Sequence, residues 1–272
     1  MAAAARAGRP PVATSDAQDA IARLAELIGR AGSVVALTGA GISTPSGIPD
    51  FRTPRTGLWE NVDPMEVAHI DAFHSDPARF WSFYGERFAS LAEKQPNGAH
   101  HALAALARAG RLDAIVTQNI DMLHRRAGEA ELVEVHGSIA SSSCLSCPGA
   151  IGLEEVRARV GAEADGVPRC EHCGAPLKPD VVLFGELLDP RALERARELC
   201  STAEVLLCIG TSLEVHPVAG LPSLTSAAGG AVAILTQGPT PLDEIADVRL
   251  HGDVVAELAA LAAALDVSIA HD

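Results

Sequence analysis

Short apolar runs and amphipathic stretches alternate along most of the chain. The first helical stretch carries Ile21, Leu24, Leu27 and Ile28 on one face, and Gly32 ends it. Further helical stretches are predicted at about residues 98–109, 190–200 and 253–265. The runs that read as buried strands are Ser33–Leu37, Ala114–Val116, Leu132–Val135, Val205–Ile209 and Ala231–Leu235. This alternation predicts an α/β fold, with a parallel sheet covered by helices on both faces.

Two stretches interrupt the alternation. Residues 45–95 contain eight of the nine aromatic residues, and residues 140–184 contain four of the six cysteines. We expect these insertions to pack together as a smaller module. The predicted division is a flexible tail at 1–15, a large domain from 16–44, 96–139 and 185–268, and a small domain from 45–95 and 140–184.

The net charge of the chain limits the classes of partner that it is expected to bind. The chain has 21 Lys and Arg against 35 Asp and Glu, a net charge of −14, and no run of basic residues. Nucleic-acid binders usually carry a basic stripe, so we expect no direct nucleic-acid partner. A cationic partner such as a lysine-rich peptide would be attracted by this field.

No stretch predicts a secretory signal or a membrane segment. Residues 1–14 lack the apolar run of a signal peptide, and the uncharged stretch between Glu214 and Asp243 is broken by prolines and glycines. We therefore expect a cytoplasmic protein without a membrane partner.

Four cysteines have the spacing of a zinc site. They form the pairs Cys144-x2-Cys147 and Cys170-x2-Cys173, with 22 residues between the pairs. Four thiolates complete the tetrahedron that zinc prefers and leave no position for water, which predicts one structural zinc ion. Disulfides are the less favoured alternative, and a zinc ribbon that only binds a partner stays open. Cys200 and Cys208 lie apart from this cluster, and we expect both to pack in the core. We expect His172, between Cys170 and Cys173, to be a solvated loop residue and not a ligand.

A glycine-rich loop follows the first apolar run. The segment Gly39-Ala-Gly-Ile-Ser43 would let the backbone approach a pyrophosphate, with free N–H groups facing the anion. The full dinucleotide fingerprint is absent, because Thr44 takes its third glycine position and Pro45 and Pro49 prevent an ordinary helix. No strand ends in an acidic ribose ligand about 20 residues further on. The pattern thus disfavours a hydride-transferring dehydrogenase.

Polar clusters follow three further apolar runs. They are Thr117-Gln-Asn-Ile-Asp121, His136-Gly-Ser138 and Gly210-Thr-Ser212. Ligands of open α/β sheets bind at the carboxyl ends of strands, so four such ends predict a ligand site, whereas one alone would favour a helix cap. In this setting we interpret His136 as a positioned general base.

Together these motifs closely resemble those of the sirtuins, the NAD-dependent protein lysine deacylases. The similarity runs from about residue 16 to about residue 265 and rests on segments 39–52, 117–121, 136–137, 180–186 and 210–213 and on the two cysteine pairs. It implies a Rossmann-like large domain, a small domain that holds zinc, and NAD in the cleft between them. The implied reaction transfers the lysine acyl group to ADP-ribose, releasing nicotinamide and 2′-O-acyl-ADP-ribose. Zinc would take no part in it.

The resemblance also implies roles for individual residues. His136 and Asn119 would be catalytic, and His136 and Gln118 would approach the ribose of the nicotinamide half. Ile48, Asn119 and Asp121 would form the nicotinamide pocket. The full set of implied cofactor contacts is Gly39, Ala40, Gly41, Ser43, Thr44, Ile48, Asp50, Phe51, Arg52, Gln118, Asn119, Ile120, Asp121, His136, Gly210, Thr211, Ser212, Thr236 and Gln237.

Acylated peptides would add as an extended strand between two segments of the chain, Val182–Gly185 and Ser212–Val215. The implied contacts are Val182, Phe184, Gly185, Glu214 and Val215. We expect broad tolerance of peptide sequence, because backbone pairing reads side chains weakly.

Two features depart from the usual family pattern. Thr236 and Gln237 stand where the family usually has an asparagine that contacts the adenosine. Tyr84 and Arg87 have the Tyr-x-x-Arg spacing by which one sirtuin class holds succinyl or malonyl carboxylates, although the two residues could equally share one face of an ordinary helix. Because the segment 49–54 resembles the deacetylase form, acetyl-lysine is the leading prediction.

Two other classes of function stay open at this stage. The same activated ribose would serve mono-ADP-ribosyl transfer or NAD hydrolysis, which predicts nicotinamide release without an acylated peptide. A catalytically silent NAD- and zinc-binding module is the third hypothesis. The presence of both His136 and Asn119 disfavours it.

Overall fold

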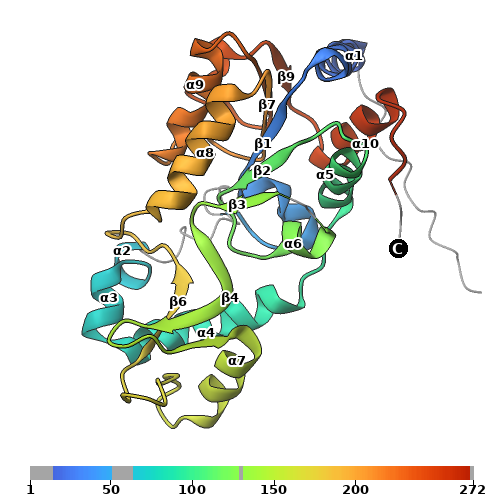
Figure 1. Ribbon diagram of the computed structural model, residues 1–272. Helices are drawn as coiled ribbons and strands as arrows, with labels where there is room; N and C mark the ends of the chain where they lie inside the picture. Colours follow the sequence, from blue (N-terminus) through green and yellow to red (C-terminus); the bar gives the residue numbers. More distant parts are fainter. Residues whose placement is uncertain (1–14, 51–63, 129–130, 270–272) are drawn as a thin grey trace, which may run out of the picture.

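The computed structural model describes residues 15–50, 64–128 and 131–269, in which a large parallel sheet stands beside a smaller antiparallel one (Figure 1). The predicted tail at 1–15 lies outside these residues except for Ser15, which begins helix α1 (Ser15–Arg30). Within the described residues, no helix combines the length and apolar character that crossing a membrane would require.

Six strands form the large sheet in the order β3-β2-β1-β7-β8-β9, and each neighbouring pair is parallel. Their bounds are β1 Val34–Thr38, β2 Ala114–Thr117, β3 Leu132–Glu134, β7 Val205–Ile209, β8 Ala231–Leu235 and β9 Val248–Leu250. The hydrophobic pattern predicts the first five. It does not predict β9, a three-residue edge strand interrupted by Arg249.

Helices cover both faces of this sheet, which confirms the predicted fold class (Figure 1). In β1, Val34 and Ala36 point to one core while Val35 and Leu37 point to the other, because successive side chains of a strand alternate. The first face is covered by α1, α5 (Gly98–Arg108) and α10 (Val254–Ala264), and the second by α8 (Pro190–Thr202) and α9 (Leu221–Ala227).

The two insertions share one aromatic core. Its strands are β4 (Gly137–Cys144), β5 (Ala150–Gly152) and β6 (Leu177–Val181), and its helices are α2 (Pro64–Val67), α3 (Ile70–Ser75), α4 (Pro77–Glu93) and α7 (Leu153–Ala162). Phe80, Trp81 and Phe88 of α4 pack with Ile139 of β4. The buried indole N–H of Trp81 donates to the carbonyl of Leu177, 3.0 Å away.

The register of the large sheet brings the carboxyl ends of its strands to one edge. Thr38 pairs with both Thr117 and Ile209, which end β2 and β7. Glu134 pairs with Thr117, and Leu235 pairs with Ile209. The polar clusters recognised in the sequence follow these residues directly, so they meet at one edge.

Candidate functional site

Two glycine loops pack backbone against backbone at this edge. Gly41 N–H donates to the carbonyl of Gly210, 2.8 Å away, and a Cβ on Gly210 would lie 2.3 Å from the nitrogen of Ile42. Gly210 also has a φ of +59°, which favours glycine. The amides of Gly39, Gly41, Ile42 and Ser43 all donate to carbonyls of the protein. The expectation of free amides facing an anion therefore does not hold for these four residues, and the close approach of the loops accounts for the glycines.

A buried polar network forms the floor of the site. The Asn119 amide nitrogen donates to the carbonyl of Gly39 at 3.0 Å and to Ser43 Oγ at 3.2 Å. Ser43 Oγ donates in turn to Asp121 Oδ2 at 2.7 Å, and Asp121 Oδ1 accepts the Leu123 N–H at 2.9 Å. The side chains of Asn119, Ser43 and Asp121 are thereby fixed without rotational freedom.

Two threonines that were not among the predicted contact residues support this floor. Thr117 Oγ1 accepts the Asn119 N–H at 3.1 Å and the Thr38 hydroxyl at 2.8 Å. Thr38 Oγ1 also lies 2.9 Å from His124 Nε2. The available signal is that both threonines end otherwise aliphatic, fully buried strands.

His136 lies at the same edge, two residues after the end of β3. Its Nδ1 is 3.0 Å from the carbonyl oxygen of Gln118, so Nδ1 carries the proton and Nε2 is left as an acceptor. Burial lowers the pKa of His136, and the hydrogen bond to Gln118 only partly offsets that effect. The Gln118 side chain donates to Thr211 Oγ1 at 2.9 Å, which links the ends of β2, β3 and β7.

The other predicted cofactor contacts occupy the same edge less deeply. Ala40, Ile48, Asp50 and Ile120 are half-buried, and Thr44 and Ser212 are exposed. Thr236 follows β8, where its N–H donates to the carbonyl of Leu250, and Gln237 is exposed beside it. Phe51 and Arg52 lie outside the described residues.

The predicted peptide segment at residues 182–185 leaves the small sheet next to His136. Val182 N–H donates to the carbonyl of His136 at 2.8 Å. Phe184 pairs with the residues on either side of His69, through Ala68 and Ile70. The side chains of Phe184 and Val215 are 46% and 36% exposed, so both predicted contact segments offer apolar surface to a partner.

The four paired cysteines converge at the far end of the small sheet. Their sulfur atoms approach one another at 3.4, 3.4 and 3.6 Å, and all four lie within 4.8 Å. A zinc–sulfur distance of about 2.3 Å gives tetrahedral edges of about 3.8 Å, so the cluster fits one zinc ion. All six cysteines are free thiols, which disfavours the disulfide alternative. His172 is exposed, as predicted.

Strand β4 separates the cysteine cluster from His136. It begins at Gly137, directly after His136, and ends at Cys144, and eight residues at about 3.3 Å each span roughly 20–25 Å. A zinc ion held by these cysteines would therefore lie too far from His136 to take part in its chemistry, which fits a structural role. Cys200 and Cys208 are fully buried, and burial raises the pKa of both thiols, which confirms their packing role.

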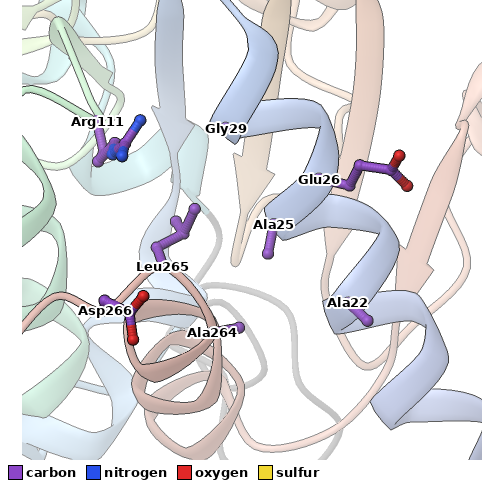
Figure 2. Close-up of a pocket in the computed structure, with 8 residues that line it drawn as sticks. All are labelled: Ala22, Ala25, Glu26, Gly29, Arg111, Ala264, Leu265 and Asp266. Atoms are coloured by element: carbon purple, nitrogen blue, oxygen red, sulfur yellow. The ribbon is translucent and has the colours of Figure 1, made fainter.

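A surface hollow of about 400 Å³ lies elsewhere, between α1 and the end of α10 (Figure 2). Gly29 and Arg111, which line it, precede β1 and β2. It therefore stands at the amino-terminal edge of the sheet, opposite the polar clusters. Figure 2 shows mostly short side chains around it, with Glu26, Arg111 and Asp266 as the charged ones.

Comparison with known proteins shows the family of this chain. Residues 39–217 match the Sir2 family model. This chain belongs to the Sir2 family. A relative from Sulfolobus acidocaldarius, named NAD-dependent protein deacetylase, is 45% identical over 84% of this chain and 88% of its own. One from Ralstonia nicotianae, named NAD-dependent protein deacylase, is 42% identical over 89% of this chain and 95% of its own.

Solved Sir2 structures superpose on most of this chain. A Sir2 complex with a p53 peptide and NAD+ has a TM-score of 0.82 at 38% identity and covers 89% of this chain and 96% of its own. A Sir2 structure bound to a propionylated peptide has a TM-score of 0.83 at 36% identity and covers 90% of this chain and 98% of its own.

Tyr84 and Arg87 of this Sir2 chain lie on α4. Tyr84 is 8% exposed between Phe80 and Phe88, at ring distances of 4.7 and 5.2 Å, and burial raises its pKa to about 12. The Arg87 guanidinium stacks 4.0 Å over Phe83, and among the described residues no carboxylate forms an ion pair with it. Both residues thus take part in packing, while the Arg87 charge has no anionic partner there.

Proposed function

We propose that this Sir2 protein is an NAD-dependent protein lysine deacetylase, which transfers the acyl group to ADP-ribose and releases nicotinamide and 2′-O-acyl-ADP-ribose. The observation that carries the proposal is the placement of His136, with Nδ1 fixed by Gln118, at the same sheet edge as the Asn119–Ser43–Asp121 network. The names of its relatives support the same class of enzyme.

Bound NAD would supply a ribose carbon that nicotinamide leaves and that the acyl oxygen joins. His136 would accept a proton from a ribose hydroxyl at Nε2, the nitrogen that Gln118 leaves available. A base works best when it is neutral at the working pH, and burial favours the neutral imidazole. The His136 imidazole is thus oriented and neutral before substrate binds.

The nicotinamide pocket in this proposal uses Ile48, Asn119 and Asp121. The Asp121 carboxylate and the side-chain carbonyl of Asn119 are acceptors suited to the amide N–H₂ group of nicotinamide. Their buried, hydrogen-bonded environment supports tight orientation, because a fixed acceptor loses no rotational freedom on binding.

The remaining cofactor contacts follow the order of the strands. Gly210, Thr211 and Ser212 after β7 would face the adenosine side, with Thr236 and Gln237 after β8 next to them. Thr and Gln still offer hydrogen-bonding groups in place of the usual family asparagine. The resemblance further suggests that Ala40, Thr44, Phe51 and Arg52 would close over the bound NAD.

Acylated peptides would lie between residues 182–185 and 212–215, with Phe184 and Val215 as exposed apolar contacts. We further propose that the peptides are acetylated rather than succinylated, because Tyr84 and Arg87 already serve the packing of α4. A succinyl or malonyl preference is the alternative. It is supported by the charge of Arg87, which forms no ion pair with a carboxylate among the described residues. A cytoplasmic location fits cysteines that are not joined in disulfides.

The test is nicotinamide release from NAD with an acetyl-lysine peptide, with a succinyl-lysine peptide, and with no peptide. We expect release to require the acetyl peptide and to fall at least 100-fold in His136→Ala. The half-buried His101, which takes part in none of the hydrogen bonds described above for the site, provides the control His101→Ala, which should keep wild-type rates. Release without any peptide would instead identify an NAD hydrolase or ADP-ribosyltransferase, and faster release with the succinyl peptide would assign a role to Tyr84 and Arg87.

A further inference from the structure

A buried lysine lies directly beneath the peptide segment. Lys178 is in β6, and its side chain is 9% exposed. Lysine is rarely buried without a partner, and this chain uses arginine for 19 of its 21 basic residues. The choice of lysine at a buried position therefore points to a specific requirement.

Three acceptor oxygens surround the ammonium group of Lys178, one for each of its N–H donors. The ammonium donates to the carbonyls of Pro179 at 3.1 Å and Val181 at 2.8 Å, and it pairs with Glu186 Oε2 at 2.9 Å. A compact ammonium suits three acceptors gathered around one point, whereas the flat fork of arginine does not.

Glu186 connects Lys178 to the predicted peptide segment at residues 182–185. The same Oε2 accepts the N–H of Leu183 at 2.9 Å, and Glu186 N–H donates back to the Leu183 carbonyl at 3.1 Å. Gly185, with a φ of +85°, allows the turn between these two residues. The ion pair thus ties the two ends of residues 181–186 together, because Lys178 binds both the Val181 carbonyl and Glu186. Within this segment, Val182 N–H donates to His136 and Phe184 N–H donates to Ala68.

We propose that the Lys178–Glu186 pair positions residues 182–185 for the acylated peptide and so sets peptide affinity without setting NAD affinity. This inference rests on the proposed function. Strand addition needs backbone N–H and C=O groups held in fixed directions, and a segment ordered beforehand loses less entropy on binding. Lys178 and Glu186 are positioning residues, because they act through the segment and not on the reacting atoms.

The experiment compares Lys178→Met, Glu186→Gln and the double variant with wild type. Arg195→Met is the control, because Arg195 on α8 forms an exposed ion pair with Glu131, away from the peptide segment, and the variant removes one cation as Lys178→Met does. For Lys178→Met we expect the KM for acetyl peptide to rise roughly 5- to 20-fold, with the KM for NAD within about 2-fold. The double variant should be less impaired, because it does not leave the half-buried Glu186 carboxylate without its cation.

Two further readouts separate positioning from general damage. Hydrogen exchange at the Leu183 amide should accelerate at least 10-fold in Lys178→Met, and zinc content should stay at one ion per chain. An unchanged peptide KM in a folded variant, or an equal rise in both KM values, would overturn the inference. If Lys178→Met does not fold, Glu186→Gln and the double variant give the same comparison. Wild-type protein that binds acetyl peptide without releasing nicotinamide would refute the proposed function instead, and peptide affinity measured by fluorescence anisotropy would then test the pair.

Discussion

His100 makes the stability of this protein depend on pH. The residue is fully buried at the start of α5, where its Nδ1 accepts the N–H of Asn97, and its ring lies 4.8 Å from that of His124. Burial, followed by the neighbouring histidines, lowers the pKa of His100 to about 2. The imidazole is therefore neutral in the folded protein across the whole working range of pH.

The sign and size of the effect follow from proton linkage. Unfolded His100 binds a proton with a pKa near 6.5, whereas the folded protein excludes it, so stability is fully present above pH 6.5 and is lost as the pH falls toward 2. At pH 5 the loss is RT ln(1 + 10^1.5), or about 2 kcal/mol. Other groups also titrate there, so the contribution must be isolated with a variant.

The variant is His100→Gln, measured by urea unfolding at pH 8, 6.5 and 5. Glutamine at this position can still accept the Asn97 N–H as a capping-box partner, but it does not titrate. We expect wild type to lose about 2 kcal/mol more than the variant between pH 8 and pH 5, with His101→Gln behaving as wild type. Equal losses in wild type and His100→Gln would refute the argument that burial keeps His100 neutral.

Three further predictions use the site and its supports. Because burial lowers the pKa of His136 and only neutral imidazole accepts a proton, the acid limb of a kcat/KM–pH profile should have its midpoint below pH 6.5; a higher midpoint would contradict this. Cys147→Ser should reduce bound zinc from one ion per chain to almost none and lower the Tm, as measured by metal analysis and calorimetry, whereas retained zinc would exclude the four-cysteine site. Gly210→Ala, whose Cβ would meet Ile42, should cost about 2–4 kcal/mol in chemical unfolding. Gly229→Ala, with a φ of +88° but open space around it, should cost only about 1 kcal/mol, and equal costs would show that the contact does not matter.

Much of the fold and the outline of the site can be predicted from the sequence alone. The apolar runs that become β1, β2 and β7 are continuous because these strands are buried on both faces, and such runs stand out in a sequence. The cysteine pairs and the polar residues after each strand are likewise local patterns. Since parallel strands end at one edge, local patterns sufficed to predict that His136, Asn119 and Gly210 would lie near one another.

Other features depended on which residues the tertiary structure brings together. The hydroxyl contact between Thr38 and Thr117 and the ion pair between Lys178 and Glu186 depend on strand register and on a turn at Gly185, neither of which has a periodic signal. The glycines of the first loop suggested an anion cradle, but the structure uses Gly41 and Gly210 to let two loops touch. The sequence determined which chemical groups stand at the strand ends, because alternation and composition are local properties. Only the tertiary structure decided which of these groups satisfy one another and which stay available for substrate, because hydrogen bonds between distant segments depend on packing.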